Sequence, residues 1–234
     1  MNAEVPKNNI NNNNPNILFL CLPDKESPIG GVKQIHRQAE HLTALNYNAI
    51  IVSEETGFKP SWFKSDAKTE SVKKLQEDKE INKENSIIVI PETYVSANQE
   101  NIYGWDISQY QKVIFNQNAY YTMGDASAET IFRFYDDTNV IQILTVSEDS
   151  YNYLNGSMAI LDRKISRIIN SIEDFFEPSS NKEKIMHWMP RKNSGHAQSV
   201  IKSMGRIHVE NGKDWNGSAL EGMKHIEVAK KLNK

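Results

Sequence analysis

The stretch that decides the fold is Ile17-Leu18-Phe19-Leu20-Cys21-Leu22, an unbroken apolar run near the start of the chain. An apolar run without alternation is typical of a strand that is buried on both faces of a parallel sheet. A loop follows over 23–30, and residues 31–45 then show the three- and four-residue apolar spacing of an amphipathic helix. A second apolar run at 49–52 completes a strand–helix–strand unit, whose two strands have to be parallel.

The same kind of apolar run recurs further along the chain. We predict further strands at 87–91, 112–116 and 140–146, and helices at 72–80 and 148–154. This alternation of strands and helices favours an α/β domain with a doubly wound parallel sheet over residues 17–162.

A second, incomplete α/β section is expected after this domain. Its predicted elements are a strand at 164–170, a polar linker at 174–183, a strand at 184–189, a helix at 196–203, a short strand at 207–209 and a helix at 224–232. The roughly 50 residues after 184 are too few for the βαβαβ half of a doubly wound sheet. We therefore expect four regions: a disordered Asn-rich leader at 1–16, the α/β domain at 17–162, a linker with a crossover strand at 163–183, and the beginning of a second domain at 184–234.

Composition and charge exclude several classes of protein. The 234 residues are 38% hydrophobic and 24% charged, which supplies a core and excludes a wholly disordered chain. No apolar run approaches the roughly 20 residues that cross a bilayer. The net charge of −3 provides no basic excess for a nucleic-acid partner. The single cysteine, Cys21, fits a reducing compartment, and the start of the chain has no apolar signal segment, so we expect a cytoplasmic protein.

Gly30 and Gly31 form the first candidate site, between the first predicted strand and the first predicted helix. The N-terminus of a helix offers unpaired N–H groups and a partial positive charge, and glycine lets a ligand approach the backbone closely. A plain tight turn is the alternative interpretation. The glycine spacing matches neither a dinucleotide-binding fingerprint nor a P-loop.

The second candidate site follows the strand predicted at 112–116. Asn116, Gln117 and Asn118 come directly before the aromatic pair Tyr120-Tyr121. At the ligand-binding edge of a parallel sheet, amides bind hydroxyl groups and aromatic rings stack on sugars. A polar loop that covers packed tyrosines is the alternative.

Arg191 and Lys192 form the third candidate, after the strand predicted at 184–189. A forked guanidinium and an ammonium group together suit a diphosphate, although ordinary solvated surface charge has the same appearance. The six histidines show no metal-ligand spacing, and there is no nucleophile elbow. The sequence therefore predicts no metal, and it identifies no catalytic base.

Three segments together resemble one family of enzymes. They are Pro28-Ile29-Gly30-Gly31-Val32, the run Lys112-Val113-Ile114-Phe115-Asn116-Gln117-Asn118-Ala119-Tyr120-Tyr121, and Ile185-Met186-His187-Trp188-Met189-Pro190-Arg191-Lys192-Asn193. In order and spacing they are similar to the glycine loop, the cleft loop and the start of the second domain in GT-B glycosyltransferases of family 4, the "group 1" type. The resemblance covers roughly residues 17–234.

This resemblance implies a retaining, nucleotide-sugar-dependent glycosyltransferase with two Rossmann-like domains. It implies that Gly30, Gly31, Arg191 and Lys192 contact the donor diphosphate, and that Asn116, Gln117, Asn118 and Tyr120 face the acceptor. Charge that develops on the leaving diphosphate would be stabilised by such preorganised donors. The nucleotide-sugar is then a substrate, and no cofactor or metal is expected.

The sequence departs from the family pattern in two respects. The later Glu-Gly-Phe-Gly-type loop with its second Glu is absent, and Asn or Gln stands where many members have a cleft-loop His. The resemblance therefore implies a truncated glycosyltransferase that lacks most of the donor pocket, with a separate chain as the candidate source of the missing half. The alternatives are a non-catalytic α/β module that binds a saccharide, a nucleotide or a partner, and a degenerate gene product.

Overall fold

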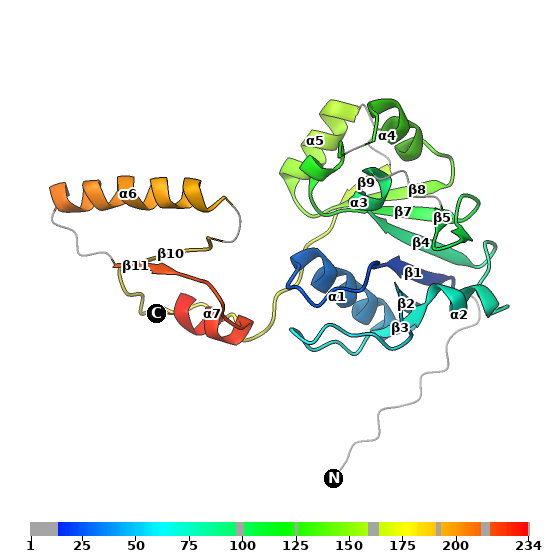
Figure 1. Ribbon diagram of the computed structural model, residues 1–234, viewed down its shortest axis with the longest axis horizontal. Coiled ribbons are helices and arrows are strands. Elements are labelled where there is room, and N and C mark those ends of the chain that lie inside the picture. Colours follow the sequence, from blue (N-terminus) through cyan, green and yellow to red (C-terminus); the bar gives the residue numbers. More distant parts are fainter. Residues whose placement is uncertain are drawn as a thin grey trace, which may run out of the picture. The chain divides into compact units, whose positions relative to one another are not determined.

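The computed structural model describes residues 14–96, 101–124, 126–158, 164–190, 193–211 and 216–233. The chain divides into two compact units, Met1–Ser171 and Ile172–Lys234. We describe each unit by itself (Figure 1).

The first unit is built on a seven-stranded sheet in the order β3-β2-β1-β4-β7-β8-β9, and every neighbouring pair of strands is parallel. The strands are β1 (Asn16–Leu20), β2 (Asn48–Ser53), β3 (Lys68–Ser71), β4 (Ser86–Pro91), β7 (Gln111–Asn116), β8 (Val140–Thr145) and β9 (Ile165–Arg167). This order confirms the predicted Rossmann-like, doubly wound α/β fold.

Helices cover both faces of this sheet. They are α1 (Gly30–Ala44), α2 (Val72–Glu77), α3 (Glu92–Ser96), the 3₁₀ turn η1 (Ala119–Tyr121), α4 (Ala128–Tyr135) and α5 (Glu148–Met158). The unit also contains a small antiparallel hairpin of β5 (Asn101–Ile102) and β6 (Trp105–Asp106). Figure 1 shows these elements around the strands of the unit.

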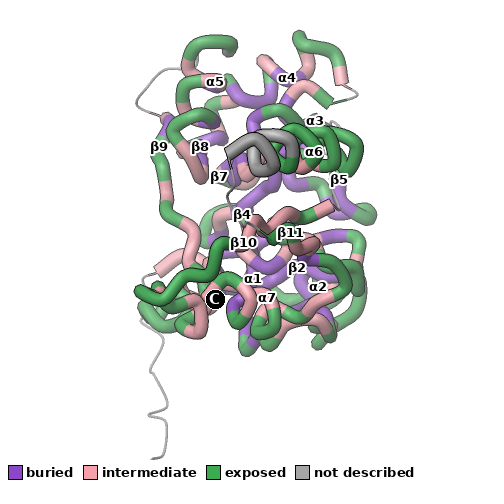
Figure 2. The backbone as a smooth tube through the Cα atoms, turned by 90° about the vertical axis from the view of Figure 1, so that its left-hand side faces the viewer, coloured by how far each residue is buried: buried purple, intermediate pink, exposed green. Residues whose placement is uncertain are grey.

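The first strand explains why the sheet is buried on both sides. Leu18 and Leu20 belong to a core cluster with residues of α2, α3 and α4, whereas Ile17 and Phe19 belong to a second cluster with Ile35 of α1. Each buried side chain of this size contributes about 2 kcal/mol relative to exposure. Figure 2 shows mainly buried residues along β2 and β4, two strands inside the sheet. Because successive side chains of β1 enter two different core clusters, its sequence is an unbroken apolar run.

Several elements of the first unit are absent from the sequence prediction, among them α3, the β5–β6 hairpin and η1, and one predicted strand belongs to a different place. The polar edge strand β3 and the helix α4 form in stretches for which no element was predicted. The strand predicted at 164–170 forms as β9, but it pairs with β8 as the last strand of the first sheet. The first unit consequently extends to Ser171, beyond the expected boundary at 162.

The second unit contains β10 (Ile185–Trp188), α6 (Ser194–Asn211), β11 (Asn216–Ala219) and α7 (His225–Leu232), and β10 and β11 form a two-stranded parallel sheet. The strand predicted at 207–209 is wrong, because these residues continue α6. Among the residues of this unit whose burial is described (172–190, 193–205 and 216–233), only Leu220 and Ala229 are buried. A unit with so little buried apolar surface has little hydrophobic stabilisation of its own.

No helix in the described part of the chain is both long enough and apolar enough to cross a bilayer.

Candidate ligand site at the carboxyl edge of the sheet

The strand order puts a topological switch point at the carboxyl ends of β1 and β4. These two strands are neighbours, but α1, which follows β1, packs on one face of the sheet, and α3, which follows β4, packs on the other. Connections that diverge in this way leave a ligand crevice at the switch point of a doubly wound sheet. The segments that follow β1, β4 and β7 supply the candidate residues.

Gly30 and Gly31 are the first two residues of α1. The N-cap residue, Ile29, forms no side-chain hydrogen bond to the helix, and the first turn holds no acidic residue. The positive end of a 15-residue helix therefore meets this edge without a carboxylate of its own to neutralise it. A Cβ at Gly30 would have no neighbour within 4 Å.

Gly31 is in contact with Gln117, which comes directly after β7. The Gln117 Nε2 donates to the Gly31 carbonyl oxygen across 3.3 Å, although the two residues are 86 positions apart. A Cβ at Gly31 would lie only 3.1 Å from the same nitrogen. The fold thus brings together two residues that the sequence had assigned to separate sites.

Glu92 joins this contact, and the sequence analysis did not single it out. Its side chain is buried, and Oε2 accepts a hydrogen bond of 3.0 Å from the backbone N–H of Gln117. Burial raises the pKa of the Glu92 carboxyl above its ordinary value, and hydrogen bonds from the backbone of Gln117, Glu92 and Asn118 oppose that rise. Its position directly after a buried strand was the signal that could have identified it.

Tyr94 of α3 contacts the segment that follows β1. Its hydroxyl accepts a hydrogen bond of 2.6 Å from the backbone N–H of Leu22 and donates to the carbonyl oxygen of the same residue. Burial raises the pKa of this hydroxyl, so Tyr94 stays protonated and can donate. The start of the loop between β1 and α1 is therefore held against α3.

Asn116 occupies a different environment from the one its sequence position suggested. The side chain is fully buried, and its amide nitrogen donates to the hydroxyl of Thr122 at 2.7 Å and to that of Tyr135 at 2.9 Å. Both partners are themselves buried. Asn116 is thus a support of the loop after β7, and its side chain does not face an acceptor as expected.

Tyr120 is the exposed member of this loop, with 66% of its surface accessible. Its hydroxyl donates to the Asp149 Oδ2 at 3.2 Å, and its ring centroid lies 5.4 Å from that of Tyr153. The hydrogen bond to Asp149 and the negative charge of that carboxylate raise the pKa of Tyr120. Asn118 caps the turn, because its Oδ1 accepts from the Tyr120 N–H at 3.1 Å.

The remaining predicted site residues, Arg191 and Lys192, lie outside the described residues. Within the described ranges, no group of three His, Cys, Asp or Glu side chains is arranged to hold a metal ion. The arrangement at the edge of the first sheet therefore offers backbone N–H groups, amides, one buried carboxyl and an exposed aromatic ring.

A scan of the sequence against models of protein families finds no match, and a search of curated proteins finds no relative.

Proposed function

We propose that this chain is part of a glycosyltransferase that moves a hexosyl group from a nucleotide-sugar to a saccharide or cell-envelope acceptor, with retention of configuration. The observation that carries the proposal is the contact between Gly31 and Gln117. The glycine loop and the cleft loop, which resemble the same enzyme family in sequence, come together at the switch point of a doubly wound sheet.

The α1 N-terminus is the proposed contact for the donor diphosphate. Its first turn has no acidic residue and no side-chain cap, and an anion is favoured at such a helix end. Because Gly31 has no side chain, the space beside it is taken by the side-chain amide of Gln117. A phosphate oxygen would either displace this amide or accept a hydrogen bond from it. Arg191 and Lys192 remain predicted as additional diphosphate ligands.

The chemistry follows from where charge develops. As the glycosidic bond to the nucleotide breaks, negative charge grows on the leaving diphosphate and the sugar becomes oxocarbenium-like. Backbone N–H groups held in place by α1 would stabilise that charge without reorganisation. Glu92 has no assigned chemical step, and its role in the proposal is to hold Gln117 in position. The donor is cytoplasmic in this proposal, in keeping with the single cysteine.

The test is nucleotide-sugar binding by the full chain, followed by transfer. Isothermal titration of the chain with UDP- and GDP-sugars is expected to show saturable binding. Free UDP or GDP should compete for the same site. Transfer to a saccharide acceptor is then assayed with and without a polypeptide that carries the Glu-Gly-Phe-Gly-type loop. Absence of binding to every UDP- and GDP-sugar, both by the chain alone and with that polypeptide present, would overturn the proposal.

A non-catalytic binding module is the second candidate. The observation that favours it is the small core of the second unit, whose described residues bury only Leu220 and Ala229. Nucleotide-sugar binding without transfer, in the presence of the added polypeptide, would select this alternative.

A further inference from the structure

We infer that Tyr120, Asp149 and Tyr153 form a platform for an uncharged pyranose and that this platform discriminates against anionic sugars. The inference deepens the proposed function and rests on it, because it assigns the chemical class of the acceptor sugar. It adds two residues, Asp149 and Tyr153, that the sequence analysis did not single out.

Tyr120 presents an exposed aromatic ring. Tyr120 lies in η1, directly after the loop that contains Gln117 and Asn118, and about two thirds of its surface is accessible. Tyr153 of α5 packs against the main core cluster and holds the Tyr120 ring in a tilted contact, with an interplanar angle of 54°. The Tyr120 ring thus contacts Tyr153, while most of its surface stays accessible to a ligand. The C–H groups on one face of a pyranose carry partial positive charge and match the negative face of an aromatic ring.

The carboxylate of Asp149 lies beside that ring. Asp149 is exposed in the first turn of α5 and accepts the Tyr120 hydroxyl at 3.2 Å. A carboxylate has about four acceptor positions, so Asp149 retains capacity for sugar hydroxyl groups. An aromatic face with an adjacent acceptor is the combination that orients a polyhydroxylated ring.

The charge beside the Tyr120 ring is negative. Glu148 precedes Asp149, and the guanidinium of Arg167 lies 3.7 Å from the Glu148 carboxylate. Arg167 is therefore engaged with Glu148, and Asp149 presents a negative charge to the platform. A sugar carboxylate placed there would meet a like charge and lose affinity.

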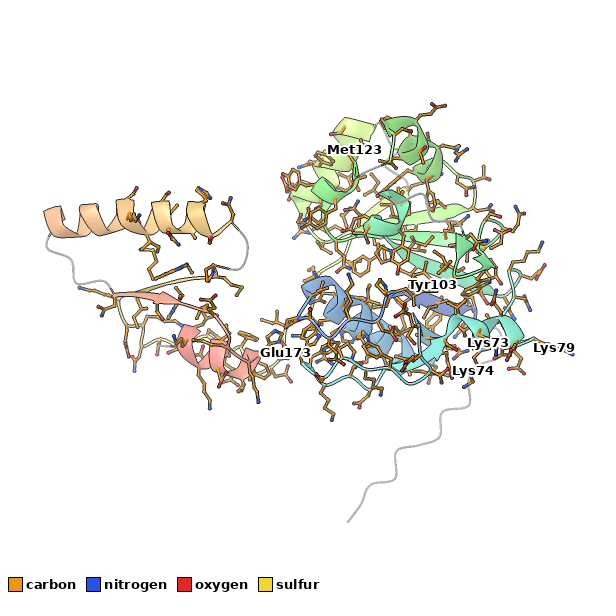
Figure 3. The ribbon with its side chains drawn as sticks, viewed as in Figure 1. Lys73, Lys74, Lys79, Tyr103, Met123 and Glu173 are labelled. Atoms are coloured by element: carbon orange, nitrogen blue, oxygen red, sulfur yellow. The ribbon has the colours of Figure 1, made fainter. Side chains whose placement is uncertain are left out.

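The chain contains a matched control. Tyr103, labelled in Figure 3, is 61% exposed, and its hydroxyl donates to the Glu54 Oε1 at 2.7 Å. Tyr103 lies between β5 and β6 and not after β7. Substitution of Tyr103 therefore removes an exposed tyrosine with a carboxylate partner from a different part of the unit.

The experiment compares two probes that differ only at C6, methyl β-D-glucopyranoside and methyl β-D-glucopyranosiduronate. Binding to the full chain is measured by NMR titration, and circular dichroism checks that each variant is folded. We expect the glucoside to bind more tightly than the glucuronide. Tyr120→Ala should weaken glucoside binding about tenfold, and Tyr103→Ala should leave it unchanged. Asp149→Asn should raise glucuronide affinity towards that of the glucoside.

Equal affinity for the two probes, or a Tyr120→Ala variant that binds the glucoside as the wild type does, would overturn the inference. Binding of a UDP- or GDP-sugar is measured on the same samples to separate this outcome from failure of the proposed function. If the platform fails while the nucleotide-sugar still binds, only the inference is lost. If the glucoside binds as expected and no nucleotide-sugar does, the proposed function fails and the platform remains as a saccharide site.

Discussion

The side-chain amide of Gln117 lies against the backbone of Gly31, with its Nε2 3.3 Å from the Gly31 carbonyl oxygen. The space beside Gly31 is so small that a Cβ there would come within 3.1 Å of that nitrogen. The contact joins the segments after two strands, β1 and β7, that are separated in the sheet by β4. It therefore depends on the complete strand order.

A bulky residue at Gly31 is expected to abolish nucleotide-sugar binding. Gly31→Leu would push Gln117 away and fill the approach to the α1 N-terminus, whereas the fold should survive because the neighbour is a flexible side chain. Gly156→Leu in α5 is the control, since a Cβ at Gly156 has no neighbour within 4 Å. Titration with the UDP- or GDP-sugar that the wild type binds measures the effect. Wild-type affinity in Gly31→Leu would show that the glycine loop is wrongly assigned.

Glu92 is expected to hold the loop after β7 in place. Glu92→Ala leaves the backbone N–H of Gln117 without its acceptor and should lower the free energy of unfolding by about 1–3 kcal/mol. Glu92→Gln keeps an acceptor oxygen and should cost less than half as much. Urea unfolding of both variants gives the comparison, and equal losses in the two would rule out the hydrogen bond as the cause.

His36 is expected to make stability depend on pH. Its ring lies on the buried face of α1, and Nδ1 is 2.9 Å from the Ser65 hydroxyl, which donates to Glu40. Burial lowers the pKa of His36 from 6.5 to about 4, and Lys59 and Arg37 act in the same direction against the opposing charge of Glu40. The unfolded chain therefore binds a proton more readily than the folded chain between these values.

The free energy of unfolding is expected to fall as the pH is lowered. Stabilisation by His36 is complete above pH 6.5 and is lost as the pH falls towards 4, by about 3 kcal/mol in total. Urea midpoints measured across this range should show the slope in the wild type. His36→Phe should flatten it, and His41→Gln, at an exposed position of the same helix, controls for the loss of a histidine. An unchanged slope in His36→Phe would refute the assignment.

Buried Lys112 forms an ion pair with the partly exposed Asp137. The Lys112 ammonium is fully buried, 3.0 Å from the Asp137 Oδ2 and 2.7 Å from the carbonyl oxygen of Ser108. Asp137→Asn leaves this ammonium without its counter-charge and should cost roughly 3 kcal/mol. Adding Lys112→Met should recover much of the loss, because no unpaired charge then remains. A double-mutant cycle by urea unfolding tests this, and strictly additive losses would contradict it.

The two units are expected to differ in protection from hydrogen exchange. The strands β1, β4 and β7 lie inside the sheet of the first unit, whereas the described residues of the second unit bury only Leu220 and Ala229. Amides of α6 should exchange much faster than those of the three strands when mass spectrometry follows the full chain in deuterated buffer. Comparable protection would mean that another surface covers the second unit in solution and shields its amides from exchange.

The interior of the first sheet was predictable because of where its strands lie. β1 and β4 are buried on both faces, so both are continuous apolar runs that stand out in the sequence. The edge strand β3 has only one neighbour, and its sequence Lys-Thr-Glu-Ser looks like a loop. The residues 207–209 combine Ile and Val, which favour strands, yet they extend α6, because local propensity is a weak determinant.

The candidate site was predictable only in part. Glycines and amides at strand ends are visible in the sequence, and Gly31 and Gln117 were both selected for that reason. Their contact depends on which strands are neighbours, and this information lies outside either segment. Asn116 looked like a ligand residue, but it is buried, and its amide binds the hydroxyls of Thr122, directly after η1, and of Tyr135 in α4. The sequence predicted neither element. Glu92 escaped notice because a glutamate after a strand is usually solvated.

The position of β1 in the middle of the sheet also determines how the chain is assembled on the ribosome. β1 needs two partners, and the second, β4, follows much later, since Asn16 pairs with Ser86, 70 residues further on. At a synthesis rate of about 5–20 residues per second, the free edge of β1 waits roughly 4–14 seconds for that partner. During this interval the nascent chain exposes a strand edge to other chains. Slower translation before β4 should therefore favour aggregation, and chaperone capture of the emerging segment should suppress it.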